Sequence, residues 1–292
     1  MEALISLVAR NNKMFRRDKT QVFFSLLSII IVIALYGIFL QKMQVDAIEQ
    51  VTKATPETIT MVNEWLVAGL LSMIAVTTTL GAFGIAIQDL ESKSAADFLT
   101  APISRAKIQL SYVLNAFIIG FILSFIAFIA CEVFIVATGG QLLNVTEMMK
   151  VIGLLILSVL LASTLNMFLV LFVHSQNAYS TLTTFVGTLI GFLCGVYVPF
   201  GVLPSFAQNL IMYFPISHTT VLLREAFMQN SIQTVFAGAP NKLVEEYKIN
   251  FGVVYEMNGN LLASSTSLLI IVGTTIVLAA LSILLFKKRK YK

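Results

Sequence analysis

Charged residues are scarce in this sequence, and their scarcity argues against a soluble globular protein. Asp, Glu, Lys and Arg make up 12% of the 292 residues, whereas soluble domains carry about 25%. Hydrophobic residues reach 58% and the mean hydropathy is +0.89, more apolar surface than one soluble core can bury. No long polar or Pro/Gly/Ser-rich stretch divides the chain, so we expect a single membrane domain over residues 1–292.

Motifs for nucleotide binding and for common enzyme chemistry are absent as well. There is no GxxxxGK(S/T) phosphate loop, no HExxH zinc motif and no GxSxG nucleophile motif. The two histidines, His174 and His218, fall on opposite predicted sides of the membrane, and Cys131 and Cys194 lie inside apolar runs. We therefore expect no catalytic, cofactor or metal site. The basic residues gather at the flanks of apolar segments, which argues against nucleic-acid binding.

Long apolar segments are what the sequence does contain. A membrane helix needs about 20 apolar residues, and an unpaired backbone in lipid is too costly for other structures. Six segments meet this need, and together they predict an all-α integral membrane protein with six transmembrane helices: 22–40, 66–87, 112–137, 151–173, 179–198 and 266–286. The first follows a basic N-terminus, as in a signal peptide, but it exceeds the usual signal core of about 7–15 residues.

Lys and Arg are distributed unevenly between the predicted loops. Five precede the first span, three lie in the 88–108 loop and five follow the last span, so 13 of the 19 lie on one side. Loops rich in Lys and Arg stay in the cytoplasm. We therefore expect both termini to be cytoplasmic.

Two further apolar segments are not expected to cross the membrane. Residues 3–17 carry apolar side chains at helical spacing with basic residues between them, which predicts an N-terminal helix in the membrane surface. Residues 199–227 are interrupted by Pro199, Pro204 and Pro215 at intervals too short for another crossing. They predict a re-entrant helical hairpin entering from the outside.

The 88–108 loop predicts a short cytoplasmic helix over about 94–100. Ser94 followed by Asp97 resembles a capping box, Pro102 disfavours helix at the residue before it, and Ser104 can cap the next helix. Phe98 and Leu99 would then be exposed apolar side chains in a charged loop. Such a pair indicates a partner surface.

These features resemble the type-2 ATP-binding-cassette (ABC) exporter permeases of bacteria over essentially the whole chain. Their loop after the second span pairs an acidic residue with an apolar pair, a Pro, a Ser and an Arg. The matching residues here are Glu91, Phe98-Leu99, Ala101-Pro102, Ile103, Ser104 and Arg105. Their outer re-entrant segment is matched by Pro199, Pro204, Phe214-Pro215 and Arg224. One departure is Ser92-Lys93-Ser94, where the family often has Glu-Ser-Gly-Thr.

The resemblance implies a half-transporter of the bacterial cytoplasmic membrane, surrounded by lipid. It would pair with a second permease subunit, a copy of itself or a sister chain, and with two cytoplasmic ABC ATPase subunits. ATP and Mg would bind to those ATPases and not to this chain. The 88–108 loop would be the coupling helix that inserts into the ATPase, and its coupling residues would be Glu91, Asp97, Phe98, Leu99, Pro102, Ser104 and Arg105.

Four polar residues inside the predicted spans are candidates for a substrate path or a dimer interface: Glu132, Asn115, Asn166 and Thr78. Glu132 is the one acidic residue deep in a predicted span, where a carboxylate should face protein or water, although it lies near enough to the outer end to reach the interface. For the other three, hydrogen bonds that join helices are the commoner explanation.

The resemblance therefore implies a permease that exports a hydrophobic or amphipathic solute such as a drug, a lipid or a peptide. Within the same family, a lipid-linked polysaccharide or cell-wall polymer is an alternative cargo, which the single Trp and eight Tyr disfavour. A membrane sensor or scaffold that transports nothing is the alternative from another class.

Overall fold

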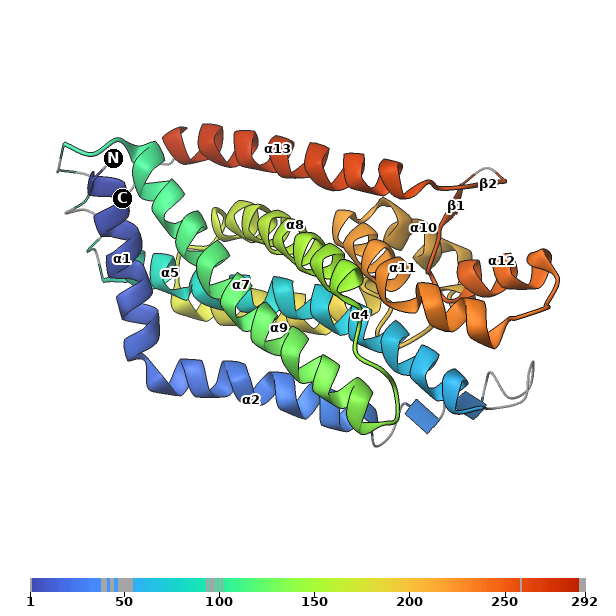
Figure 1. The fold of residues 1–292 in the computed structure, drawn as a ribbon. Coiled ribbons are helices and arrows are strands. Elements are labelled where there is room, and N and C mark those ends of the chain that lie inside the picture. Colours follow the sequence, from blue (N-terminus) through green and yellow to red (C-terminus); the bar gives the residue numbers. More distant parts are fainter. Residues whose placement is uncertain are drawn as a thin grey trace.

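The computed structural model is a bundle of helices of which several lie side by side along one axis (Figure 1). It describes residues 2–37, 41–42, 45–46, 55–92, 94, 98, 100, 102–257 and 259–288. Both chain termini lie at one end of the bundle, which we call the terminal end, and α12 lies at the opposite, distal end. The bundle is built from α1 (Glu2–Arg17), α2 (Lys19–Leu35), α4 (Pro56–Ala82), α5 (Gly84–Glu91), α7 (Arg105–Ala137), α8 (Val145–Val170), α9 (Gln176–Leu193), α10 (Ser205–Tyr213), α11 (Pro215–Val235), α12 (Asn241–Asn250) and α13 (Ser264–Lys288).

Helix α4 forms the centre of the bundle because apolar and small residues cover nearly its whole circumference. Residues 61–72 of α4 are all buried. The helix packs against α7, α8, α9 and α11, and these contacts form the main hydrophobic core. A second apolar cluster closes the terminal end and includes Leu7, Phe15 and Phe83. A helix that is apolar all round is expected at such a central position.

Four helices of the described chain are long and apolar enough to cross a membrane: α4 continued by α5 (Pro56–Glu91), α7, α8 and α13. The pair α1–α2 is bent by 73° and would be a fifth span if it were counted as one. The bend lies at Asp18, whose carboxylate accepts a hydrogen bond from the backbone N–H of Gln21 (2.9 Å) and so starts a new helix. The surface helix predicted for 3–17 is thus a separate helix.

The helix predicted over 179–198 is shorter and more polar than a typical span. Helix α9 ends at Leu193, and its first half holds Gln176, Asn177 and several Ser and Thr residues. It is not among the helices of the described chain that are apolar enough to cross a membrane. The count of six spans therefore stays a prediction.

The second predicted span, 66–87, begins later in the sequence than the helix that the structure shows. Helix α4 starts at Pro56, because Thr55 and Thr58 form a reciprocal capping box and Pro56 occupies the first helical position. Residues 56–65, which we expected in an outer loop, are therefore helical. The extension brings Glu64 into the buried part of the bundle, where it is 7% exposed.

The predicted hairpin over 199–227 begins with a 3₁₀ turn, η2 (Phe200–Val202), followed by α10 and α11. Its prolines delimit these elements, since Pro199 and Pro204 are N-caps and Pro215 opens α11. Helix α11 continues to Val235 and is buried against α4, so it is longer than predicted. The stretch between the predicted hairpin and the last predicted span also contains α12 and an antiparallel pair of two-residue strands, β1 (Glu256–Met257) and β2 (Asn260–Leu261).

Candidate functional site

A charged hydrogen-bond network joins α1, α5 and α7 at the terminal end. Arg10 of α1 donates both terminal guanidinium nitrogens to the carboxylate of Asp89, with Nη2 2.6 Å from Oδ1. The hydroxyl of Tyr112 on α7 donates to Asp89 Oδ2 over 2.7 Å. Asp89 is buried, and a buried carboxylate is tolerated when it is paired and hydrogen-bonded in this way. The same contact raises the pKa of Arg10 above its usual value, because the hydrogen bond to Asp89 favours the charged guanidinium.

Arg10 also ties the predicted coupling loop to this network. Its guanidinium carbon lies 5.1 Å from the centre of the Phe98 ring, a cation–π contact. Phe98 is half-buried and packs against the apolar cluster of the terminal end. We expected Phe98 to be exposed, whereas the structure shows it half-buried because its own chain covers part of the ring.

The remaining predicted coupling residues are mostly at the surface. Glu91, the last residue of α5, is exposed, as are Pro102, Ser104 and Arg105. Ser104 is the N-cap of α7 as predicted, although its side chain makes no capping hydrogen bond. Asp97 and Leu99 lie outside the described residues. The terminal end thus presents exposed polar residues next to a buried ionic network.

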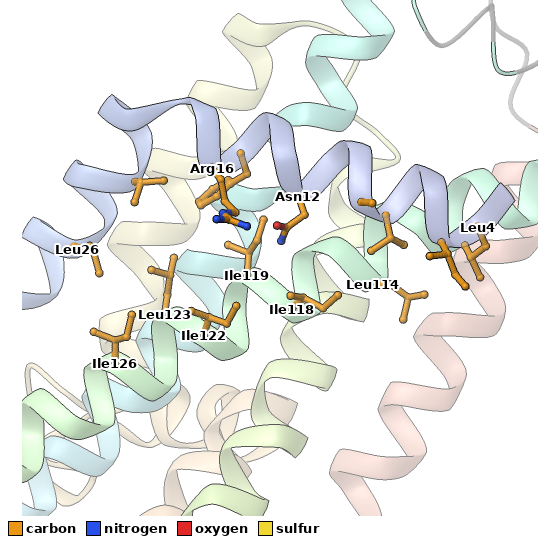
Figure 2. Close-up of a pocket in the computed structure, with 15 residues that line it drawn as sticks. Leu4, Asn12, Arg16, Leu26, Leu114, Ile118, Ile119, Ile122, Leu123 and Ile126 are labelled. Atoms are coloured by element: carbon orange, nitrogen blue, oxygen red, sulfur yellow. The ribbon is translucent and has the colours of Figure 1, made fainter. Parts of the chain in front are cut away.

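An apolar groove with a volume of about 670 Å³ lies beside this junction, between α1, α2 and α7. Figure 2 shows Asn12 and Arg16 on α1 beside a row of isoleucines on α7. The row consists of Ile118, Ile122 and Ile126, which are spaced by four residues and therefore share one face of the helix. The groove therefore has apolar walls and a polar rim on α1.

Two of the predicted path residues, Asn166 and Thr78, make buried hydrogen bonds to α4. Asn166 of α8 donates from Nδ2 to the Val76 carbonyl (2.9 Å) and to Thr79 Oγ1 (2.8 Å), both on α4. Thr78 donates to the Ile74 carbonyl of its own helix (2.6 Å). The contacts of Asn166 join α8 to α4, whereas the bond of Thr78 stays within α4.

Asn115 and Glu132, the other two, are buried within α7. Neither polar side-chain atom of Asn115 has a hydrogen-bond partner in the described chain. Glu132 is 5% exposed and accepts a hydrogen bond at Oε2 from the backbone N–H of Leu143 (3.2 Å). Its carboxylate therefore faces the loop between α7 and α8 at the distal end.

Arg224 of α11, one of the residues of the predicted re-entrant hairpin, is buried at the distal end. Its guanidinium donates to five backbone carbonyls and lies 4.4 Å from the ring of Trp65. The acceptors belong to α4, the turn after α9 and the segment after α12: Trp65, Cys194, Gly195, Phe251 and Gly252. Gly195 (φ +59°) and Gly252 (φ +61°) bring their backbones close to the guanidinium in a left-handed conformation that favours glycine. Arg224 therefore fastens three segments together.

His218, Cys131 and Cys194 also have structural surroundings. His218 is buried, with Nδ1 3.1 Å from Ser267 Oγ and Nε2 2.9 Å from the Met212 carbonyl. Both cysteines are buried and free, as their apolar neighbours predicted.

Sequence reasoning missed Arg10, Asp89, Tyr112 and Glu64 as members of buried polar sites. Arg10 and Asp89 are 79 positions apart, and no local spacing rule connects residues at such a separation. The signal that could have been used is the placement of Asp89 and Glu64 beside long apolar runs, where an unpaired carboxylate is costly.

The comparisons with known proteins agree with this architecture. The sequence profile of the family described as "ABC-2 type transporter" matches residues 2–228, which extend from α1 into α11. No curated protein matches the chain. A match over most of the chain, together with the apolar helices, shows that the chain belongs to the ABC-2 type transporter family, the membrane permease component of ABC transporters.

Proposed function

We propose that this permease exports a hydrophobic or amphipathic solute, driven by two ATPase subunits that bind the 88–108 loop. The family supplies the transporter class, and ATP hydrolysis belongs to separate subunits of such transporters. In this proposal the chain lies in a bacterial cytoplasmic membrane with both termini in the cytoplasm. It acts with a second permease subunit, a copy of itself or a sister chain.

The observation that carries the proposal is the position of Arg10 between the loop and the groove. Arg10 contacts Phe98 of the loop and pairs with Asp89, which also binds Tyr112 of α7. A partner that displaces the loop would therefore pull on α1, α5 and α7 together. Since α1 and α7 are walls of the apolar groove, the displacement would change the groove's width.

The groove favours a cargo with an apolar body. Its walls are lined by Leu, Ile, Val, Ala and Phe side chains, and its rim carries Asn12 and Arg16. Burial of apolar surface yields about 25 cal/mol per Å², so such walls retain an apolar chain better than a sugar polymer. This is the support for a hydrophobic or amphipathic solute over the polysaccharide alternative.

The test is ATP-dependent flux of fluorescent amphiphiles in liposomes that contain the permease and its ATPase. Ile122→Trp should reduce flux at least fivefold, because the larger ring fills the groove. Ile129→Trp is the matched control, since Ile129 lies on the same helix, is 49% exposed against 50% for Ile122 and does not line the groove.

Equal flux in the two variants would contradict the groove as the route of the solute. The wild-type permease with its ATPase serves as the reference. If it moves no amphiphile when ATP is added, although the ATPase stays bound and active, export itself is contradicted.

A further inference from the structure

A polar cavity of about 510 Å³ lies at the distal end, far from the groove and the coupling loop. It is enclosed by the beginning of α4, the loop between α7 and α8, and the second half of α11. Three carboxylates line it, those of Glu57, Glu64 and Glu147. None of the described residues in its wall is Lys or Arg. The cavity is therefore lined by negative charge without a matching positive group.

Glu64 is the most deeply buried of the three carboxylates, and Ser231 on α11 is its hydrogen-bonding neighbour. The Glu64 side chain is more than nine-tenths buried, and its Oε2 has no hydrogen-bond partner in the described chain. A buried carboxylate without compensation is costly, and the cost falls when a cation binds beside it. Glu64 lines the cavity, so a cation in the cavity can reach it.

The neighbouring acids strengthen the preference for a cation. Glu147 accepts hydrogen bonds from Asn230 Nδ2 (2.7 Å) and from the backbone N–H of Asn144 (3.3 Å), which fix its carboxylate at the wall of the cavity. Glu132 lies close enough to interact electrostatically with Glu64, and its Oε1 has no hydrogen-bond partner among the described residues. A positive charge between these groups would relieve their mutual repulsion.

The shape and lining of the cavity favour an organic cation over a metal ion. Within the described ranges, no three acidic, His or Cys residues lie close enough together to hold a metal. The cavity is also far larger than a metal ion, and its wall includes the hydroxyls of Thr60, Ser231 and Thr234 and the ring of Phe227. An ammonium group has three donors for such oxygens, and a short carbon chain can lie against the ring.

We propose that the distal cavity binds a small organic ammonium ion, with Glu64 as its main anionic partner and Glu147 as the second. The proposal goes beyond the transport function and does not depend on it, because binding can be measured without ATP or flux.

The experiment is equilibrium dialysis of the purified full-length chain in detergent with radiolabelled 5-amino-1-pentanol. The competitor is unlabelled 1,5-pentanediol, which differs in one group and carries no charge. We expect saturable binding of the amine and no competition by the diol. Glu64→Gln, which keeps the side-chain shape and removes the charge, should weaken binding at least tenfold.

The matched control is Glu245→Gln, which removes the same charge from an exposed position on α12 at the same end of the bundle. It should bind the amine as the wild type does. Each variant is first compared by gel filtration and by the emission of Trp65, the single tryptophan, so that a folding defect is recognised. Should Glu64→Gln misfold, Glu147→Gln takes its place with an expected loss of at least threefold.

Several results would overturn the proposal. These are absence of saturable amine binding, equal competition by the diol, or the same loss in Glu245→Gln as in Glu64→Gln. A competition with metal ions, at equal ionic strength, gives a further contradicting outcome. If Mg²⁺ displaces the amine at a far lower concentration than K⁺ does, the cavity is a metal-ion site and not an ammonium site.

Discussion

Arg10 connects the predicted coupling loop to the buried Asp89 at the terminal end. It pairs with the buried Asp89 and covers the ring of Phe98, so one residue of α1 contacts both the end of α5 and the predicted coupling loop. Ion pairs on protein surfaces contribute little to the free energy of unfolding, whereas breaking a pair with a buried member is strongly destabilising. Removal of the arginine leaves the Asp89 carboxylate buried, with the Tyr112 hydroxyl still donating to it.

We therefore predict that Arg10→Ala destabilises the protein by about 3 kcal/mol, the lower end for breaking a buried pair. Thermal unfolding of the purified chain in detergent measures the loss. Arg17→Ala, which removes an exposed arginine from the same helix, should leave the unfolding temperature unchanged. The double variant Arg10→Ala/Asp89→Asn should recover part of the loss, because the uncompensated charge is gone. Equal melting of the two single variants would show that the pair does not stabilise the fold.

Arg224 allows a second prediction at the residue scale, because it lies against the single tryptophan. Arg224→Met removes one donor from each of five backbone carbonyls, and each buried carbonyl that is left without any donor costs about 1–3 kcal/mol. We expect a low yield of folded protein and a shifted emission maximum of Trp65, whose indole also donates to the Phe251 carbonyl (2.6 Å). Arg224→Lys should restore only part of the yield and only part of the native Trp65 emission, since lysine lacks the planar fork of donors.

Emission is recorded on the monodisperse fraction, with Arg17→Met as the charge-matched control. Unchanged Trp65 emission and yield in Arg224→Met would mean that the carbonyls are satisfied without the guanidinium.

At the scale of elements, hydropathy located the helices but not their ends or their partners. The runs now seen as α7, α8 and α13 were identified because apolar residues fill a length that spans a membrane. The prolines of the 199–227 segment marked the starts of η2, α10 and α11, because proline restricts the backbone locally. By contrast, the start of α4 at Pro56 depends on a capping box in a polar stretch, which a hydropathy window averages away.

The candidate sites were harder to predict than the helices. Asp89 is buried next to Arg10, which is distant in the sequence, and Glu64 is buried at the wall of a cavity. The local sequence reveals neither the distant partner nor the cavity. Arg224 illustrates the same limit, since its acceptors come from positions 27 to 159 residues away. The family resemblance, in contrast, rested on short motifs, and the family itself is confirmed.

The predicted coupling element leads to a test that uses Leu99, a residue known here from sequence alone. Leu99→Asp would place a charge in the interface where we propose that the ATPase binds, and an unpaired buried carboxylate costs several kcal/mol. We expect at least a tenfold loss of ATPase copurification. Lys242→Asp, on the exposed surface of α12 at the distal end, should have no effect. Normal copurification of the Leu99 variant would contradict the loop as the coupling element.

At the scale of the whole molecule, α13 differs from the central helix α4 in what surrounds it. Exposed large apolar side chains occur along its length, among them Leu269, Ile276 and Leu284. It runs along the outside of the bundle with one face on α8 and α11. Large apolar faces are rarely left to water, so these side chains belong against lipid or against a second permease subunit.

The final prediction concerns the orientation of the molecule in the membrane. Lys13 on α1 and Lys242 on α12 are exposed and lie at opposite ends of the bundle. The excess of Lys and Arg at the terminal end predicts that this end faces the cytoplasm. In intact cells, a membrane-impermeant maleimide should therefore label Lys242→Cys from outside, whereas Lys13→Cys should react only after the membrane is opened.

Two features of the chain make this labelling interpretable. The native thiols of Cys131 and Cys194 are buried and should contribute little background, which the unmodified chain measures directly. Gln208→Cys on α10 reports on the 199–227 segment, which we expect to be accessible from the same side as Lys242 and never from the cytoplasm. Because α10 and α12 lie at one end of the bundle, labelling of Gln208→Cys and Lys242→Cys from opposite sides would be incompatible with the observed packing. Labelling of Lys13→Cys from outside would reverse the orientation and place the 88–108 loop beyond the reach of a cytoplasmic ATPase.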